Sequence, residues 1–253
     1  MKYIYGPVKS RRLGWSLGIS LTPYKICSFN CVYCQLGNTG DLTRERKEYV
    51  GIEEVLEELR FCLENNSLEA NKLNYITLSG SGEPTLNIKI GQLIPEIKKI
   101  TAVPLAIITN SSLLNDASVR QALCSADLIV PSLDAVNPEV FKHINRPHPD
   151  IKIEDIMNGL VNLRREFGGE IWLEVMLVSG INDDLRQIKK LKEVIDKINP
   201  DKIQLNSPVR TSQRAVVWLP IAKATTAEVG VFSVSRKKLE KIKEILGEKC
   251  EII

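Results

Sequence analysis

Cys27-Ser-Phe-Asn-Cys31-Val-Tyr-Cys34 places three cysteines on one short stretch, separated by three and then by two other residues. The stretch follows a strand-like segment at 16–21, so we expect the thiols to lie on a loop after a strand. The other cysteines, which we expect to be small buried hydrophobic residues, are scattered: Cys62, Cys124 and Cys250. In a reducing compartment, such a tight group indicates metal binding rather than disulfide bonds.

The number of thiols limits the metal that they can hold. Iron–sulfur clusters are bound by thiolates, and a [4Fe–4S] cubane bound by three cysteines keeps one iron without a protein ligand. An open coordination position is typical of catalytic metal sites, whereas structural sites are closed. The alternative is a zinc site completed by a distant ligand. Zinc ribbons have two pairs of ligands, and the chain has no second pair, its only histidines being His143 and His148.

Strand-like and helix-like segments alternate along the rest of the chain. Strand character is found at 16–21, 75–78, 104–109, 128–132, 171–178 and 202–206. Helical periodicity is found at 52–63, 91–100, 117–123, 151–167, 183–198 and 236–246, the last with Ser235 as its N-cap. Such alternation predicts a parallel sheet with right-handed crossovers. Six units are fewer than the eight of a closed barrel. The predicted α/β fold is therefore a partial (β/α)6 TIM-like barrel with parallel strands, open on one side.

The cysteine stretch resembles the signature of the radical S-adenosylmethionine (SAM) superfamily, including the aromatic Tyr33 before the last cysteine. The resemblance implies that Cys27, Cys31 and Cys34 hold one [4Fe–4S] cluster whose open iron chelates the amino and carboxylate groups of SAM. It also implies that one electron breaks the sulfonium C–S bond, and that the 5′-deoxyadenosyl radical formed abstracts hydrogen from a substrate. Tyr33 would lie near the adenine of SAM, or be a packing aromatic.

A glycine-rich turn follows the segment at 75–78. Its residues Gly80, Ser81, Gly82, Glu83 and Pro84 are similar to the Gly-Gly-Glu-Pro motif of the same superfamily, with Ser81 in place of the first glycine. Glycine lets the backbone approach a ligand closely, but glycine turns are common. Together with the cysteine motif, the resemblance implies that this turn binds the methionine amino group of SAM.

Polar residues also lie at the ends of the later strands. The resemblance implies that Asn110, Ser132 and Asp134 contact the ribose or the methionyl carboxylate of SAM, with helix capping as the alternative. Glu174 lies amid apolar residues of a strand, where a carboxylate is costly unless it is paired or solvated. We interpret it as a lumen-facing acid near SAM or substrate, with a structural ion pair as the alternative.

Candidate substrate contacts come from the last strand and the loop after it. Gln204 and Asn206 share one face of the strand at 202–206, and Arg210 follows in a loop where arginine suits recognition of a carboxylate or phosphate. A solvated surface arginine is the alternative. Basic patches at Lys9–Arg12 and Arg44–Lys47 flank the cysteine loop and could touch phosphates, although most charge runs are simply solvated.

A narrower resemblance is to the wyosine-type radical SAM proteins, which include the enzyme that builds the tricyclic base of tRNA wybutosine. It is carried over about residues 3–210 by Tyr5-Gly-Pro-Val, the cysteine loop, Ser79–Leu86 and Ser132-Leu-Asp-Ala135. The wyosine-forming enzyme has further cysteines for a second cluster ahead of the SAM motif, and no cysteine precedes Cys27 here. The resemblance therefore implies a related enzyme with a single cluster and another substrate, such as RNA, a nucleoside or a small metabolite.

Two other classes of function stay open at this point. One is an activase that installs a glycyl radical on a partner protein, and the other is a non-catalytic metal-binding module. A radical SAM enzyme with one cluster would need an external electron donor, a flavodoxin or a ferredoxin.

Composition sets broader bounds on the chain. With 43% hydrophobic and 26% charged residues it is an ordinary globular composition, and its net charge of +3 does not by itself indicate nucleic-acid binding. No apolar stretch reaches the roughly 18–20 residues that cross a bilayer. We therefore expect a cytoplasmic protein without membrane contact. We also expect residues 1–253 to form a single radical SAM domain, with a core at about 15–210 and a C-terminal helical extension at about 211–253.

Overall fold

The computed structural model describes residues 1–65, 72–208 and 233–253. The strands within these ranges are β1 (Ile4–Ser10), β2 (Gly14–Ile19), β3 (Ile26–Cys27), β4 (Asp41–Leu42), β5 (Tyr75–Leu78), β6 (Leu105–Thr109), β7 (Leu128–Pro131), β8 (Glu170–Met176), β9 (Lys202–Asn206) and β10 (Cys250–Ile252). The helices are α1 (Ile52–Asn65), α3 (Ile90–Ile100), α4 (Ala117–Leu123), α5 (Pro138–Asn145), α6 (Ile153–Glu166), α7 (Leu185–Ile198) and α8 (Arg236–Leu246), together with a short 3-10 helix, η1 (Pro84–Leu86).

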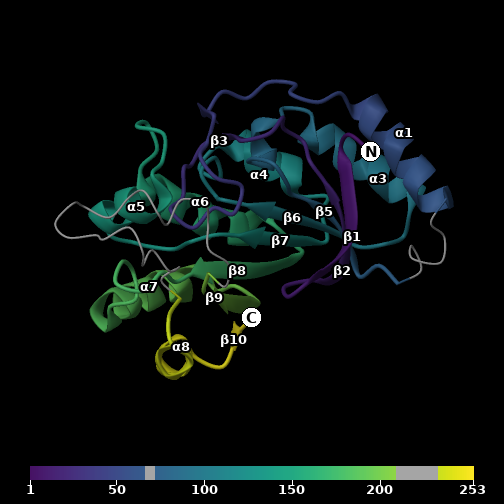
Figure 1. Cartoon of the computed structure of the whole chain (residues 1–253). Coiled ribbons are helices and arrows are strands. Elements are labelled where there is room, and N and C mark those ends of the chain that lie inside the picture. Colours follow the sequence, from purple (N-terminus) through teal and green to yellow (C-terminus); the bar gives the residue numbers. More distant parts are fainter. Residues whose placement is uncertain (66–71, 209–232) are drawn as a thin grey trace, which may run out of the picture.

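One open sheet organises the molecule. Its strand order is β1-β2-β5-β6-β7-β8-β9-β10, while β3 and β4 pair separately in the cysteine loop region. β1 is antiparallel to β2, and all neighbours from β2 to β10 are parallel. Among the described residues no strand pairing joins β1 to β10, so the predicted open, partial barrel of parallel strands is confirmed (Figure 1).

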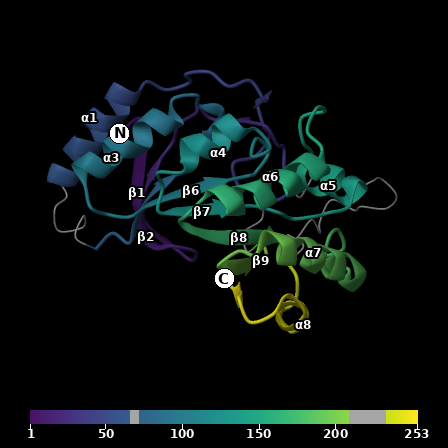
Figure 2. The same ribbon diagram turned by 180° about the vertical axis from the view of Figure 1, so that it is seen from behind.

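Helices cover one face of this sheet. Turning the molecule by 180° brings α3, α4 and α6 in front of the strands, and successive helices from α1 to α8, apart from α5, pack against one another (Figure 2). Alternate strand residues such as Ile107 and Ile129 join the large core formed with these helices. The residues between them, Ala106, Leu128 and Val130, form a second, smaller cluster on the inner face. Successive side chains alternate between the two faces because the strands are pleated. The face that carries the smaller cluster lines the lumen of the half-barrel.

The six predicted strands correspond to β2 and β5–β9, and the six predicted helices correspond to α1, α3, α4, α6, α7 and α8. Ser235 occupies the N-cap position of α8, but its side chain makes no capping hydrogen bond. The C-terminal segment is not only helical, because β10 adds a parallel strand beside β9. The sheet also begins at Ile4, ahead of the predicted core boundary at about residue 15.

Candidate functional site

The cysteine loop lies against the C-terminal end of α5. The main-chain N–H of Asn30 donates to the carbonyl of Asn145 at 3.0 Å, and that of Val32 donates to the carbonyl of Ile144 at 2.9 Å. The ring of Phe29 packs edge-on against that of Phe141, with ring centroids 5.5 Å apart. α5 itself was not predicted from the sequence. The loop conformation thus depends on an element more than a hundred residues further along the chain.

Each of the three thiols has a nitrogen donor from a different part of the fold. Lys25 Nζ lies 3.0 Å from Cys34 Sγ, Asn110 Nδ2 lies 3.6 Å from Cys27 Sγ, and Asn145 Nδ2 lies 3.6 Å from Cys31 Sγ. Hydrogen bonds from N–H groups stabilise the charged form of a sulfur ligand. The sulfurs are therefore surrounded as metal-bound thiolates require.

Burial opposes ionisation of Cys27 and Cys31 while no metal is bound. It raises the pKa of Cys27 to about 11, with a further increase from the charge of Glu83. It also raises the pKa of Cys31 far above the ordinary range, and negative charges on Asp134, Cys27 and Cys34 add to the effect. Metal binding requires thiolates and so releases protons. Cys27 and Cys31 would therefore each lose a proton on binding a metal.

Within the described ranges, no three or more histidine, cysteine, aspartate or glutamate side chains are gathered closely enough to hold one metal ion. A cubane differs from a single ion because its thiolates bind separate irons at separate corners. The residues that fit such a group are the three cysteines, each with its own nitrogen donor and each within electrostatic range of another.

Hydrogen bonds to its main chain hold Lys25 in place. Its N–H donates to the carbonyl of Ser81 at 2.7 Å, and its carbonyl accepts from the N–H groups of Gly40 and Asp41. Its φ of 59° lies in the left-handed region, which is unfavourable for a residue with a side chain, yet the side chain is almost fully buried. The fold thus keeps a buried ammonium group at Cys34, in a backbone conformation that glycine would adopt more easily.

The glycine-rich turn packs directly against the cysteine loop. The N–H of Glu83 donates to the carbonyl of Ile26, the residue before Cys27, at 3.2 Å. A Cβ atom on Gly82 would lie 1.8 Å from that same carbonyl oxygen, so only glycine fits the approach. The glycine-rich turn and the cysteine loop are therefore in direct main-chain contact.

The side chain of Glu83 is used within the protein. Its buried carboxylate accepts hydrogen bonds from the N–H and hydroxyl of Thr85, from the hydroxyl of Thr109 at 2.7 Å and from the N–H of Asn110 at 2.8 Å. Burial still raises its pKa. Glu83 therefore ties the turn after β5 to the end of β6, and its carboxylate oxygens are already hydrogen-bonded within the protein.

Tyr33, Asp134 and Asn145 form a buried network beside Cys31. Oδ2 of Asp134 accepts from the Tyr33 hydroxyl at 2.6 Å and from Asn145 Nδ2 at 2.7 Å, while Oδ1 accepts from the Met176 N–H at 2.9 Å. Burial raises the pKa of Asp134 to about 6 and that of Tyr33 well above its usual range. A cavity of about 10 Å³, about the room of one water, is lined in part by Tyr33, Asn110, Ser132, Asp134 and Asn145.

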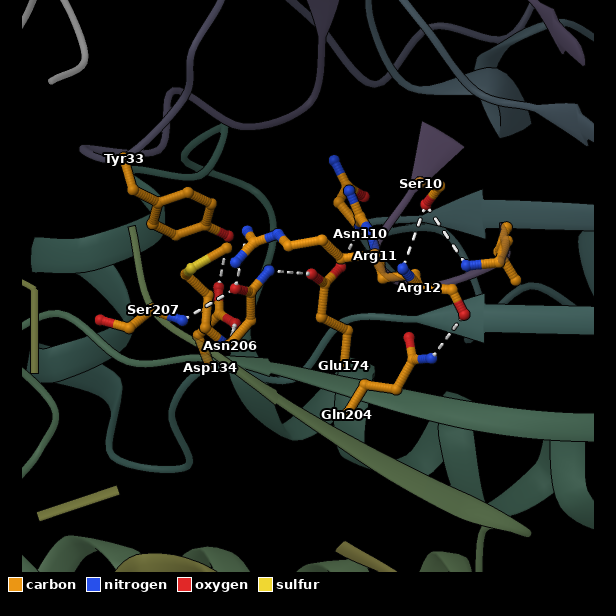
Figure 3. Close-up of polar contacts among 12 residues, drawn as sticks. Ser10, Arg11, Arg12, Tyr33, Asn110, Asp134, Glu174, Gln204, Asn206 and Ser207 are labelled. Atoms are coloured by element: carbon orange, nitrogen blue, oxygen red, sulfur yellow. Dashed lines mark hydrogen bonds and ion pairs between the residues drawn. The ribbon is translucent and has the colours of Figure 1, made fainter. Parts of the chain in front are cut away.

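The remaining predicted residues lie on the lumen side of β7, β8 and β9. Ser132 is bridged to Glu174, and Glu174 is paired with Gln204 in the strand register. Glu174 Oε2 forms an ion pair with Arg12 at 2.6 Å, and its Oε1 accepts from Asn206 Nδ2 at 3.1 Å. Figure 3 shows Glu174 and Asn206 directed toward each other, with Asp134 and Tyr33 on the side of Asn206. The structure shows the ion-pair alternative for Glu174, and a position near SAM or substrate stays a prediction.

Some predictions from the sequence were wrong, incomplete or fall outside the described residues. Arg210 lies outside the described residues. Cys124 is exposed rather than buried, while Cys62 and Cys250 are buried as expected. Lys25 and Asn145, which donate to the cysteine sulfurs, were not predicted at all. The only local signal for Lys25 was its position two residues before Cys27.

Among the described residues, no helix combines the length and the apolar character needed to cross a membrane.

Comparison with known proteins adds family information to this geometry. The family profile described as the Radical SAM superfamily matches residues 21–191, more than half of the chain. A UPF0026 protein of Methanocaldococcus jannaschii is 33% identical over 249 residues, which cover 98% of this chain and 77% of that protein. A Brachyspira hyodysenteriae protein named GTPase Obg is 41% identical over 251 residues, or 99% of this chain, but the chain spans only 34% of that protein's length.

A solved structure shares the fold. The structure of TYW1 with a lysine-pyruvate adduct bound aligns with a TM-score of 0.63 at 18% identity, covering 91% of this chain and 72% of the TYW1 chain. The predicted likeness to wyosine-type proteins is confirmed at the level of architecture.

Proposed function

We propose, from the premise that this chain belongs to the radical SAM superfamily, that Cys27, Cys31 and Cys34 hold its cluster and that SAM binds beside them at the ends of β5, β6 and β7. The chain is an enzyme of that superfamily, whose members bind a [4Fe–4S] cluster and SAM. Support for the residue assignment comes from one observation above all: each of the three sulfurs has its own nitrogen donor.

Cys27, Cys31 and Cys34 would hold the cluster, which would supply one-electron reductive cleavage of SAM as the start of hydrogen abstraction from a substrate. Lys25, Asn110 and Asn145 stabilise the charge on the thiolates. In this proposal the turn of Gly80, Ser81 and Gly82 lies beside the methionine amino group of SAM, and Glu83 fixes that turn. Pro84 starts η1, which continues from this turn.

The network around Asp134 would orient the nucleoside part of SAM. Tyr33 is positioned by Asp134, and Ser132 and Asn110 line the same small cavity. In this proposal Tyr33 lies near the adenine, while Ser132 and Asp134 are on the ribose side. Glu174 lies beside these residues because it forms a strand bridge with Ser132.

The substrate is proposed to enter the lumen next to Gln204 and Asn206, with Arg210 in the following loop, and to be RNA, a nucleoside or a small metabolite. Electrons are proposed to come from a flavodoxin or ferredoxin. We also propose that residues 1–253 act as one radical SAM domain.

Anaerobic reconstitution with iron and sulfide tests the assignment. We expect about four irons per chain, and 5′-deoxyadenosine after addition of SAM and dithionite. Cys31→Ala should lose both, whereas the matched control Cys124→Ala, at an exposed thiol outside the site, should keep both. Full iron content and SAM cleavage in the Cys31 variant would refute the assignment.

A further inference from the structure

The β1–β2 hairpin turns into the lumen of the half-barrel. Ser10 Oγ accepts from the N–H groups of Arg12 and Leu13, which fixes the turn. The Leu13 side chain is buried against Ala106, Leu128 and Val130 on the inner face of β6 and β7. The hairpin thus closes one end of the lumen with an apolar plug, and it carries Arg11 and Arg12 beside that plug.

A layer of polar side chains lies next to the apolar cluster around Leu13, further along the strands toward their C-terminal ends. Trp172 packs against the apolar cluster, and Glu174, two residues further along β8, faces the same side of the strand. In the strand register Glu174 pairs with Gln204, and Met176 pairs with Asn206. The bridge from Glu174 to Ser132 places this layer next to the proposed SAM residues. A molecule bound in this polar layer would therefore lie between the apolar cluster around Leu13 and the proposed SAM site.

Two arginines from the hairpin reach this layer. Arg12 Nη1 pairs with Glu174 Oε2 at 2.6 Å, and Arg11 Nη2 donates to Asn206 Oδ1 at 3.2 Å (Figure 3). Arg11 Nη1 also donates to the main-chain oxygen of Ile253 at 3.2 Å. In the described ranges no carboxylate side chain lies within ion-pair distance of Arg11. Its partners are therefore the side-chain amide oxygen of Asn206 and a main-chain oxygen of Ile253.

One buried acceptor in the layer lacks a donor. Gln204 Nε2 donates to the carbonyl of Arg12 at 3.2 Å, which fixes the orientation of the amide. Gln204 Oε1 is buried and has no hydrogen-bond partner among the described residues. A buried polar atom without a partner costs about 1–3 kcal/mol, and such atoms in native proteins call for an explanation such as a missing ligand.

We propose that Arg11, Arg12, Glu174, Gln204 and Asn206 bind an anionic group of the substrate, a carboxylate or a phosphate, and that Gln204 Oε1 accepts from an adjacent N–H or O–H of the same molecule. The inference rests on the proposed function, because it places the substrate beside SAM. Two guanidinium groups reach the layer together, and Glu174 pairs with one of them, Arg12. Arg11 supplies the planar donors that suit carboxylate and phosphate, while Glu174 holds Arg12 in position.

Binding of simple anions to the reconstituted holoenzyme with SAM tests this proposal. The probes are sodium phosphate and sodium acetate, compared with sodium chloride at equal ionic strength, and the readout is the thermal unfolding midpoint as a function of anion concentration. A ligand that binds only the folded protein raises this midpoint. We expect at least one of the two probes to raise it above the chloride value; phosphate alone would assign a phosphoryl group, and acetate alone a carboxylate.

Two variants distinguish a site that binds an anion from contacts that only stabilise the fold. Arg11→Gln and Gln204→Glu should each weaken the apparent affinity for the anion at least tenfold. Arg186→Gln changes an exposed arginine on α7 and should not alter it. If Arg11→Gln fails to fold, Gln204→Glu still tests the site, because it puts a negative charge where the anion would bind.

Outcomes of the two proposals are distinguishable. Native holoenzyme that cleaves SAM but shows no anion effect, or shows one that survives both variants, would overturn the anion site and leave the proposed function standing. Native protein that binds no iron and makes no 5′-deoxyadenosine would overturn the proposed function itself.

Discussion

Replacing Gly82 by alanine should disrupt the cluster loop without touching a cysteine. The added Cβ would lie 1.8 Å from the carbonyl oxygen of Ile26 and 2.5 Å from Oγ1 of Thr22. Relieving the first contact requires the glycine-rich turn and the cysteine loop to separate by about 1 Å or more. Ile26 directly precedes Cys27, and its carbonyl also accepts from Glu83 N–H, so both motifs would move.

The energetic cost follows from the nature of the obstacle. Overpacking costs typically about 1–3 kcal/mol, and the nearest obstacle to Gly82→Ala is a main-chain carbonyl rather than a flexible side-chain tip. We therefore expect the free energy of unfolding of the metal-free protein to fall by about 3 kcal/mol. Iron content after anaerobic reconstitution should fall below about half of the native value, because the first cysteine of the loop is displaced.

Urea unfolding and iron analysis check this prediction, with Gly168→Ala as the matched control. An added Cβ at Gly168 meets no atom within 4 Å, so the control should change stability by less than about 0.5 kcal/mol. If Gly82→Ala matched the native protein in both stability and iron content, the turn and the cysteine loop would not be in the contact that the site requires.

Three further predictions concern single side chains. Lys25→Met should shift the cluster's reduction potential to a more negative value in a redox titration followed by electron paramagnetic resonance, because a buried positive charge and an N–H···S hydrogen bond are lost; an unchanged potential would show that the ammonium does not act on the cluster. Burial raises the pKa of Asp134 from 3.8 to about 6, so the folded protein holds this proton more tightly than the unfolded chain. The resulting stabilisation, up to about 3 kcal/mol, should be complete below about pH 4 and lost as the pH rises through about 6; urea unfolding of the metal-free protein at several pH values should show the decline, and a difference from Asp134→Asn that does not change with pH would contradict it. Arg120→Ala should lower the free energy of unfolding in urea by about 2 kcal/mol, because two main-chain carbonyls lose their buried donor, whereas the pair with the partly exposed Glu166 should contribute little; a loss below about 0.5 kcal/mol, as for an ordinary surface substitution, would contradict this.

The sequence predicts best those features that repeat or that lie close together along the chain. Alternating strands and helices have clear periodicity, so the sheet and its outer helices could be derived from residue patterns alone. The cysteine loop could be recognised because its three thiols lie on one short stretch. The turn at Gly82 and Glu83 follows its strand directly, so its place at the sheet edge was predictable as well.

Features that depend on distant contacts were not predictable. β1 is interrupted by a register shift between Tyr5 and Val8, which hides its strand pattern. α5 has only eight residues, yet it delivers Asn145 to Cys31 across 114 positions of sequence. The identity of the partner of Glu174 likewise required the fold, since Arg12 lies 162 positions away.

Lys25 illustrates a different limit. Nothing in the neighbouring sequence distinguishes it from a solvated lysine before a metal-binding loop. Its burial arises because Ser81, Gly40 and Asp41 bond its main chain from two other segments. A role defined by converging backbone contacts is visible only after the chain has folded.

The most direct test of the central claim is the electron paramagnetic resonance spectrum of the reduced, reconstituted protein recorded with and without SAM. If three thiolates leave one iron free to bind SAM, the spectrum will be that of a reduced [4Fe–4S] cluster, and adding SAM will change it. A reconstituted protein that gives no such signal, or a cluster signal that is identical with and without saturating SAM, would contradict the account.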